Sequence, residues 1–272
     1  MTRSDTNVAM LAEQIKDGAR LALPSENSGV PVAVVRALIA RGARDLRLVG
    51  GPTGGFAIDL LVGAGCVASV EAAGVSLGPR GLAPRFCAAV EAGEIEMIDS
   101  TCPATHAGFV AGEKRLPFMA VRGVFGSDML KYRSDWTVID NPFPPHDPAV
   151  VVPAILPDVT ALHVPMADEA GNVWVGNRRE LKTMARAAKQ VLVTVEKIHA
   201  GNLVKDSAMA PGLLTAPYID LIALAPRGAA PTALPPDYGP DDAMLDSYAS
   251  AAKTREGFDG WLADFLGPDG AA

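Results

Sequence analysis

One stretch decides the fold, residues Leu46–Gly74, which reads LRLVGGPTGGFAIDLLVGAGCVASVEAAG. Its first apolar run, Leu46–Gly50, predicts a strand, the residues GPTGGF form a glycine loop, and IDLLVGAG predicts a helix. A second apolar run, CVASVEAAG, predicts another strand. A strand, a helix and a strand in this order indicate a βαβ unit with parallel strands and a right-handed crossover.

The same alternation continues on both sides of this unit. Predicted strands fall at 19–23, 95–99, 116–121, 153–168, 190–198 and 217–226, and predicted helices at 7–18, 31–42, 82–93, 103–115, 178–189 and 257–267. Strands that alternate with helices are typical of a parallel sheet covered by helices on both faces. The sequence therefore predicts an α/β fold with an open, mostly parallel, doubly wound sheet.

Residues 125–150 interrupt the alternation. Their sequence, rich in proline and polar residues, predicts loops or a small antiparallel excursion. We expect this segment to form a flap or small subdomain within a single domain that spans residues 1–272. The 27 glycines and 22 prolines are spread along the whole chain, which favours many short βα connections over a linker.

Composition excludes several classes of partner. The chain has 24 Lys and Arg against 31 Asp and Glu, a net charge of −7. Nucleic acids and anionic membranes bind basic surfaces, so neither is expected as a partner. The three cysteines (Cys66, Cys87 and Cys102) have neither disulfide nor zinc-ligand spacing, and no metal site is predicted. There is no secretory signal and no run of roughly 18 apolar residues, so we expect a cytoplasmic protein.

Three polar or glycine-bearing loops follow predicted strands, at Pro24–Gly29, Gly50–Gly55 and Asp99–Cys102. Ligands of open parallel sheets bind beyond the carboxyl ends of the strands, so these loops are candidate binding segments. In the second loop, Gly54 and Gly55 would let backbone amides approach an anion or a developing oxyanion. Its sequence is neither a dinucleotide fingerprint nor a phosphate-binding P-loop. A tight turn without function is the alternative.

The first loop, SENSG, places Ser25 and Glu26 after a strand. Ser25 is a candidate substrate-binding residue, and Glu26 is a candidate nucleophile or base in a cleft. A solvent-exposed loop that caps the next helix is the alternative, because Ser and Asn are favoured at helix N-termini.

The third loop, DSTC, carries two hydroxyl groups, those of Ser100 and Thr101. Both are candidates for binding a substrate carbonyl, and Ser100 is also a candidate catalytic residue; capping of the following helix is the alternative for at least one of them. Cys102 is a conceivable nucleophile, although His106, one helical turn further on, is weak evidence for a partner base.

Two further residues draw attention because of their positions near strand ends. Arg122 follows the predicted strand 116–121 and is suited to bidentate binding of a carboxylate or phosphate. A salt bridge to a neighbouring acid such as Asp128 is the alternative. His163 lies near the end of an apolar run and is expected to be a satisfied polar residue close to the sheet edge.

Several short motifs occur in a characteristic order: D-x-x-x-GAG from Asp59, LPF-x-x-x-RG from Leu116, AD-x-x-GN from Ala167 and GA-x-PT from Gly228. In this order the chain resembles the α (A) subunit of class I CoA-transferases, in the glutaconate CoA-transferase-like branch. The resemblance runs from about residue 10 to the C-terminus. It implies the sheet fold shared by NagB, RpiA and the CoA-transferases.

The resemblance also implies a partner and a chemistry. Such α subunits form αβ or α2β2 complexes with a homologous β subunit, and the active site lies between the two chains. A β-subunit glutamate attacks an acyl-CoA, which gives a glutamyl–acyl anhydride and then an enzyme–CoA thioester. Coenzyme A thioester and carboxylate are the substrates, and no cofactor is permanently bound. The α-subunit loops hold the acyl group, and the matching positions are Gly54, Gly55, Ser100 and Arg122.

The sequence departs from the family pattern at two positions. Many α subunits have a glycine-rich run where this chain has SENSG, and Ser25-Glu26-Asn27 resembles the β subunit's nucleophile motif but follows the wrong strand. A related branch that opens steroid-derived rings in CoA thioesters uses an α-subunit glutamate where this chain has Ser100. We therefore expect a CoA-transferase. An acyl-CoA or C–C hydrolase, or a non-catalytic ligand-binding module of sugar-isomerase-like fold, are the alternatives.

Overall fold

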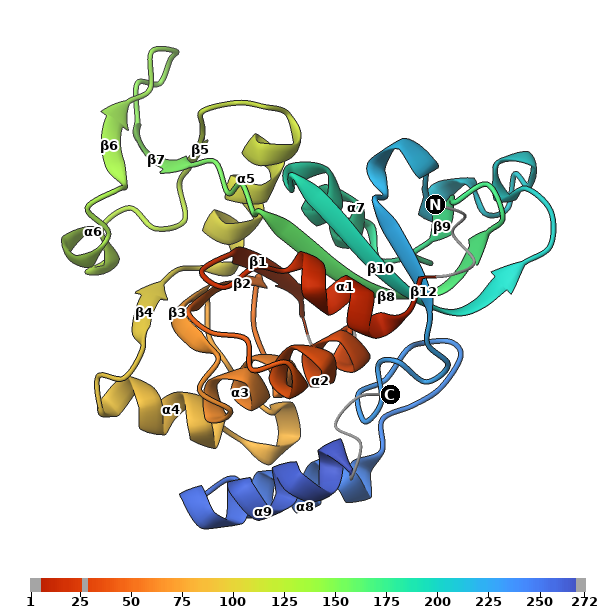
Figure 1. The fold of residues 1–272 in the computed structure, drawn as a ribbon. Helices are drawn as coiled ribbons and strands as arrows, with labels where there is room; N and C mark the ends of the chain where they lie inside the picture. Colours follow the sequence, from red (N-terminus) through yellow and green to blue (C-terminus); the bar gives the residue numbers. More distant parts are fainter. Residues whose placement is uncertain (1–5, 26–28, 268–272) are drawn as a thin grey trace.

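A twisted parallel sheet forms the centre of the computed structural model, which describes residues 6–25 and 29–267 (Figure 1). Within this part of the chain seven strands are parallel, in the spatial order β12-β10-β8-β1-β2-β3-β4. Their bounds are β1 Arg20–Pro24, β2 Leu46–Gly51, β3 Val67–Ala72, β4 Glu96–Asp99, β8 Val159–Asp168, β10 Gln190–His199 and β12 Leu221–Leu224. The predicted open, mostly parallel α/β sheet is confirmed.

Two short antiparallel strands extend the sheet at the far end of β8. The chain turns back through Gly171 and Asn172 into β9 (Val173–Trp174), which pairs with β8, and β11 (Leu213–Leu214) pairs with β9. Four 3-10 helices lie in the described connections, at Gly78–Arg80, Leu203–Lys205, Ala210–Gly212 and Ala216–Tyr218.

Helices cover both faces of the sheet, as the sequence predicted. One face packs against α1 (Val8–Gln14), α2 (Val32–Ala40), α3 (Phe56–Gly63) and α4 (Pro84–Glu91), and the other against α5 (Cys102–Glu113) and α7 (Arg179–Ala187). Side chains alternate between the two cores along each strand, as a pleated strand requires: Leu48 faces the first core and Val49 the second.

Two C-terminal helices pack outside α3. They are α8 (Asp242–Ala251), which was not predicted from the sequence, and α9 (Arg255–Leu266). Edge-to-face aromatic contacts join them to α3: the ring centroid of Phe56 lies 4.8 Å from that of Tyr248 and 6.0 Å from that of Trp261. In Figure 1 this pair forms the blue layer below α3 and α4.

A separate three-stranded antiparallel sheet stands apart from the main sheet (Figure 1). The strand order is β5-β7-β6, with β5 at Phe118–Val121, β6 at Thr137–Asp140 and β7 at Pro148–Pro153. The short helix α6 (Met129–Tyr132) lies in the connection between β5 and β6. We call residues 118–153 the small sheet. Its own apolar cluster includes Trp136, Val150 and Val152 and packs on Ala104 and Ala107 of α5.

The small sheet changes the expected role of the strand at 116–121. That strand, β5, pairs with β7 instead of extending the parallel sheet, so β4 remains at the outer edge of the main sheet. At the opposite end, β8 is flanked by β1 and β10. The expectation that His163 lies close to a sheet edge was therefore wrong, because β8 is an internal strand.

Candidate active site at the carboxyl edge of the sheet

The order of the parallel strands reverses between β1 and β8. From β1 the chain builds outward through β2, β3 and β4, and it then returns to place β8, β10 and β12 on the other side. Ligands of such sheets bind at the carboxyl ends of the strands where the order reverses. β1 and β8 share only two register pairs, Leu21–Val159 and Ala22–Thr160. Beyond them, the backbone N–H of His163 on β8 donates to the carbonyl of Gly29 in the loop after β1, at 2.8 Å.

The loop after β1 is held at both of its described ends. The Ser25 hydroxyl donates to the carbonyl of Gly51 at the end of β2, and Gly29 has a φ of +85°. A Cβ at Gly29 would overlap the carbonyl oxygen of His163, so both the backbone conformation and the close approach require glycine. Glu26, the candidate nucleophile or base, lies outside the described residues.

The glycine loop after β2 is tied to the loop after β3. The Gly54 N–H donates to the carbonyl of Gly74, and the Gly54 carbonyl accepts from the Ser76 N–H. Gly55 precedes the first residue of α3, and its carbonyl accepts from the Asp59 N–H. The Gly54 amide is thus engaged within the fold, although none of the glycines at positions 50, 51, 54 and 55 has the positive φ that a tight turn would explain. A contact between this loop and a substrate stays a prediction.

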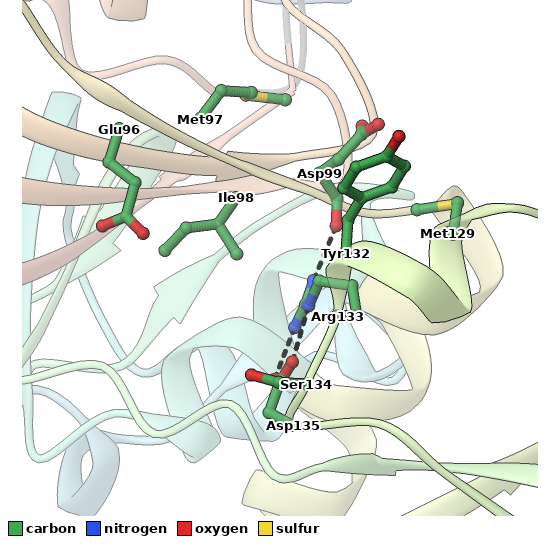
Figure 2. A pocket seen from close by; sticks show the side chains of 9 residues that line it. All are labelled: Glu96, Met97, Ile98, Asp99, Met129, Tyr132, Arg133, Ser134 and Asp135. Carbon is green, nitrogen blue, oxygen red and sulfur yellow. Dashed lines mark hydrogen bonds and ion pairs between the residues drawn. The ribbon is translucent and has the colours of Figure 1, made fainter. Parts of the chain in front are cut away.

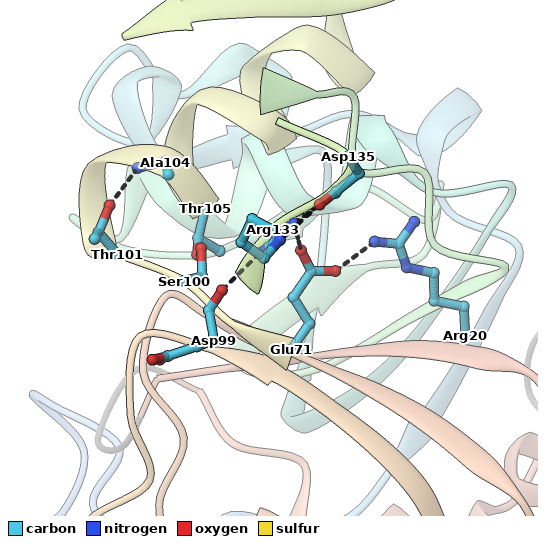
Figure 3. A network of polar contacts seen from close by, with 9 residues as sticks. All are labelled: Arg20, Glu71, Asp99, Ser100, Thr101, Ala104, Thr105, Arg133 and Asp135. Carbon is cyan, nitrogen blue, oxygen red and sulfur yellow. Dashed lines mark hydrogen bonds and ion pairs between the residues drawn. The ribbon is translucent and has the colours of Figure 1, made fainter. Parts of the chain in front are cut away.

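The two hydroxyls after β4 have different roles in the fold (Figure 3). Thr101 is the N-cap of α5 and accepts from the Ala104 N–H at 3.2 Å, which is the capping alternative. Ser100 is buried, its N–H donates to the carbonyl of Ala72 on β3, and its Oγ lies 2.8 Å from Oγ1 of Thr105. Substrate binding by either hydroxyl stays a prediction.

Arg122 lies in the small sheet and not in the loops at the carboxyl edge. Its guanidinium is exposed and forms a salt bridge to Asp147, with Nη2 2.8 Å from Oδ2. Asp128, the partner suggested from the sequence, instead pairs with Lys131 at 2.7 Å. A role for Arg122 in substrate binding stays a prediction.

A polar network beside the β1–β8 junction was not predicted from the sequence. We call it the His163 network: His163, Thr194, Glu196, Arg227 and Tyr238. Nε2 of His163 lies 2.7 Å from Oε1 of Glu196, and Nδ1 lies 2.8 Å from Oγ1 of Thr194. The Tyr238 hydroxyl donates to Oε1 of Glu196 at 2.8 Å, and the Arg227 backbone N–H donates to Oε2 at 2.8 Å.

The charges in the His163 network follow from these contacts. Burial disfavours an ionised Glu196, but the hydrogen bonds from His163, the Arg227 N–H and Tyr238 outweigh it and lower the pKa of the carboxyl to about 2. Because an ionised carboxylate has no proton to donate, Nε2 of His163 must carry one. Burial and the neighbouring Glu196 charge raise the pKa of Tyr238, so its hydroxyl remains a donor.

A signal for this network is present in the sequence. Thr194 and Glu196 are alternate residues of the mostly apolar run VLVTVEKI, so they lie on one face of the strand. The register places Thr194 directly beside His163. Polar residues at alternate positions of a buried strand need partners, and this requirement identifies the cluster.

A second polar network connects the small sheet to the main sheet (Figure 3). Glu71 on β3 accepts from Nη2 of Arg20 at 2.6 Å and from Nη2 of Arg133 at 3.0 Å. Arg133 also donates to the carbonyl of Asp99 and forms a salt bridge to Asp135. Hydrogen bonding to Arg133 lowers the pKa of Asp135.

A cavity of about 490 Å³ adjoins this second network, between β4 and the small sheet (Figure 2). Its lining residues are Glu96, Met97, Ile98, Asp99, Met129, Tyr132, Arg133, Ser134 and Asp135.

Within the described ranges 6–25 and 29–267, no three His, Cys, Asp or Glu side chains come together as metal ligands. No helix of this part of the chain is long and apolar enough to span a membrane.

The order of the parallel strands reverses between β1 and β8, and loops follow the carboxyl ends of the strands there. These features define the class of open α/β proteins that bind their ligands at the carboxyl edge of the sheet. The model of the coenzyme A transferase family matches residues 5–216. The chain therefore belongs to the coenzyme A transferase family.

Relatives in this family have several activities. The A subunit of 3-oxoadipate CoA-transferase from Pseudomonas knackmussii is 31% identical over 256 residues, which cover 93% of this chain and 89% of that relative. The IpdA subunit of a cholesterol ring-cleaving hydrolase from Mycobacterium tuberculosis is 30% identical over 87% of this chain and 83% of that relative. An uncharacterised protein of Archaeoglobus fulgidus is 33% identical over 89% of this chain, but the chain spans only 54% of that relative.

Solved structures share the whole fold. Glutaconate coenzyme A-transferase from Acidaminococcus fermentans superimposes with a TM-score of 0.86 at 24% identity, covering 97% of this chain and 93% of that chain. A variant of the decarboxylase AibA/AibB superimposes with a TM-score of 0.84 at 30% identity, covering 98% of this chain and 99% of that chain.

Proposed function

We propose that this chain is the α subunit of a heteromeric CoA-transferase, which moves CoA from an acyl-CoA to a carboxylic acid of small or medium size. The observation that carries the proposal is the similarity to the corresponding subunit of 3-oxoadipate CoA-transferase across 93% of this chain and 89% of that relative. The partner would be a homologous β subunit in an αβ or α2β2 complex. The three free cysteines fit a reducing cytoplasm.

The hydrogen bonds that the candidate side chains make within this chain support a nucleophile on the partner subunit. Of the hydroxyl candidates in the described residues, Ser25 donates to a backbone carbonyl, Ser100 contacts Thr105 and Thr101 caps α5. Glu196 is engaged by three donors. Each of these groups is thus already occupied within the fold. The remaining candidate nucleophiles of this chain are Cys102, which is a free and exposed cysteine, and Glu26, which lies outside the described residues.

The reaction we propose needs no resident cofactor. A β-subunit carboxylate attacks the thioester carbonyl and expels the CoA thiolate, which leaves an acyl–glutamyl anhydride. The thiolate then attacks the glutamyl carbonyl, releases the first carboxylic acid as its carboxylate and forms an enzyme–CoA thioester. The acceptor carboxylate reverses both steps. Each tetrahedral intermediate carries an oxyanion that backbone amides of the loops can stabilise.

A C–C or acyl-CoA hydrolase is the second candidate. It is favoured by the similarity to a ring-cleaving hydrolase subunit, whose identity of 30% nearly equals that of the transferase relative. Against it stands Ser100, which offers a hydroxyl bonded to Thr105 where the resemblance implies a glutamate in the ring-opening branch.

Co-expression with candidate β subunits tests the proposal. The purified complex is assayed for CoA exchange between acyl-CoAs and a panel of carboxylic acids, and CoA release is measured without an acceptor. We expect exchange, loss of activity on borohydride treatment in the presence of acyl-CoA, and a CoA adduct on the β subunit by mass spectrometry. Acceptor-independent CoA release without exchange would establish the hydrolase instead.

A variant of Glu26 tests which of the two subunits carries the nucleophile. The Glu26→Gln variant should retain CoA exchange if the attacking carboxylate belongs to the β subunit. Conversely, a CoA adduct on Glu26, together with an inactive Glu26→Gln complex, would contradict the proposed division of labour.

A further inference from the structure

A second cavity, of about 380 Å³, adjoins the glycine loop after β2. Thr53 and Gly54 of that loop line it, together with residues 76–80 of the loop after β3 and residues of α8. We call it the α8 cavity. Its volume falls within the range of about 300 to 1,000 Å³ that is typical of ligand pockets. The α8 cavity is therefore large enough to hold part of a molecule that contacts the glycine loop.

Apolar side chains form the buried part of its wall. Phe56, Leu77, Leu245 and Tyr248 line the α8 cavity, and each is at most 7% exposed. The Tyr248 hydroxyl donates to Asp59 at 2.7 Å, so the polar end of this ring is already engaged in the core. Moving hydrocarbon from water onto such a wall is favourable, and the gain grows with the apolar area that is buried.

The charges at the α8 cavity are compensated. Of its described lining residues, only Arg80 and Asp242 are charged. Nη2 of Arg80 lies 2.6 Å from Oδ1 of Asp242, and Nε lies 2.6 Å from Oδ1 of Asp246. One guanidinium thus meets two carboxylates. A further carboxylate that left water here would find no uncompensated positive charge, which makes its transfer unfavourable.

We propose that the α8 cavity binds the hydrocarbon chain of the acyl group and selects acyl-CoAs of monocarboxylic acids over those of dicarboxylic acids. The inference rests on the proposed function, because the glycine loop is taken to contact the acyl group. An acyl chain that extends from this loop into the cavity buries its methylene groups against Phe56 and Leu245. A carboxylate at the end of the chain would instead lose its water beside Asp242.

Hexanoyl-CoA and adipyl-CoA form the decisive pair of substrates for the complete complex. Their acyl chains have the same length, but one ends in a methyl group and the other in a carboxylate. With propionate as the common acceptor, we expect kcat/KM to be about tenfold higher or more for hexanoyl-CoA. From acetyl- through butyryl- to hexanoyl-CoA, kcat/KM should rise by about threefold to fourfold for each added methylene.

Leu245→Phe tests the apolar wall. The larger side chain reduces the space in the cavity, so kcat/KM for hexanoyl-CoA should fall by about tenfold or more, while that for acetyl-CoA changes by less than about threefold. Leu262→Phe on α9 is the matched control, because Leu262 packs on the same core without lining the cavity. Leu262→Phe should keep the wild-type preference for the longer chain.

A double variant, Asp242→Asn with Asp246→Asn, tests the charges. Both aspartates are exposed, so this variant serves even if Leu245→Phe does not assemble. The guanidinium of Arg80 becomes available to a carboxylate, and kcat/KM for adipyl-CoA should rise about tenfold relative to hexanoyl-CoA. Asp259→Asn, which removes an exposed partner of Arg255 on α9, should leave this ratio unchanged.

Crystals of the complex soaked with bromohexanoate, brominated at its terminal carbon, separate the two proposals. We expect the anomalous signal of bromine inside the α8 cavity. Bromine in the cavity of a complex without CoA exchange would contradict the proposed function but support the cavity as a site for apolar chains. Bromine bound elsewhere, equal kcat/KM for hexanoyl- and adipyl-CoA, or the same preference in Leu245→Phe and Leu262→Phe would overturn the inference.

Discussion

Arg133 of the small sheet forms a buried salt bridge with Glu71 on β3, with Nη2 3.0 Å from Oε1. The side chain of Arg133 is only 6% exposed and that of Glu71 9%. The remaining oxygen of Glu71 binds Arg20, and the guanidinium of Arg133 stacks over Trp136. A salt bridge to β3, next to the edge strand β4, thereby connects the small sheet, which has its own apolar cluster, to the main sheet.

Replacing Arg133 should loosen the small sheet. Arg133→Met keeps the apolar stem but leaves Glu71 with one partner, so we expect the free energy of unfolding to fall by about 2 to 4 kcal/mol. Amide exchange in residues 118–153 should accelerate more than in β1 or β2. Chemical denaturation and hydrogen exchange measure the two effects.

Lys131→Met is the control for Arg133→Met. Lys131 pairs with Asp128 at the surface, where ion pairs contribute less than about 1 kcal/mol. An equal loss of stability in the two variants would show that the Arg133–Glu71 pair does not hold the small sheet.

The buried Asp59 of α3 should make stability depend on pH. Burial raises its pKa, although the Phe86 N–H and the Tyr248 hydroxyl donate to the carboxylate. A group with a raised pKa in the folded state contributes stability that is fully present below its unfolded pKa, about 4, and is lost as pH rises through the folded value. Asp59→Asn should therefore remove this decrease, which urea denaturation from pH 4 to 8 would measure.

Asp17→Asn is the control for Asp59→Asn, because the pKa of Asp17 is shifted in the opposite direction. Hydrogen bonds from the Arg44 N–H and the Arg41 side chain lower the pKa of Asp17, so its contribution is lost only at acid pH. Between pH 5 and 8 its stability curve should run parallel to that of the wild type. If the Asp59→Asn curve is also parallel, Asp59 does not titrate as we expect.

Gly29→Ala should destabilise the protein more than Gly18→Ala. Both glycines have positive φ, +85° and +74°, so each alanine carries a backbone penalty of about 1 to 2 kcal/mol. Only at Gly29 would the added Cβ also overlap the His163 carbonyl, which should add about 1 to 3 kcal/mol. Denaturant midpoints measure the difference, and equal midpoints would contradict the close approach of the two segments.

Glu196 should contribute to resistance against acid. Its pKa is lowered from 4.5 to about 2, so its stabilisation is present above pH 4.5 and is lost as pH falls through 2. At pH 7 we expect Glu196→Gln to cost about 2 kcal/mol, less than the full pKa difference because solvent screens part of the interaction. The two unfolding free energies should converge below pH 4.5, and a gap that stays constant to pH 2 would contradict this role.

The sequence was sufficient for features that are encoded locally. Mainly apolar runs such as Leu46–Gly50 and Gln190–Ile198 predicted β2 and β10, because a strand that is buried on both faces over most of its length is rich in apolar residues. Glycine positions predicted the loops after β1 and β2. The role of Thr101 as a helix cap could also be predicted from the sequence, because capping depends on a few adjacent residues.

The networks were missed because their members are far apart in the chain. His163 lies 33 residues before Glu196, which in turn lies 42 residues before Tyr238. Glu71 lies 62 residues before Arg133, and Arg133 belongs to the segment 125–150, for which the sequence predicted only loops or a small antiparallel excursion. Pairing of this kind depends on strand order and on the path of the small sheet, neither of which leaves a periodic signal in one sequence.

The short junction between β1 and β8 also has a consequence for how the chain folds. Strands β1 to β4 follow one another with a single α-helix between neighbours, and β8, β10 and β12 are likewise close in sequence. The junction instead joins Arg20 to Asp158, 138 residues away. Closing so long a loop is entropically slower than forming local pairs. We therefore expect each half of the sheet to form first, and the crevice between β1 and β8 to be completed in the last step of folding.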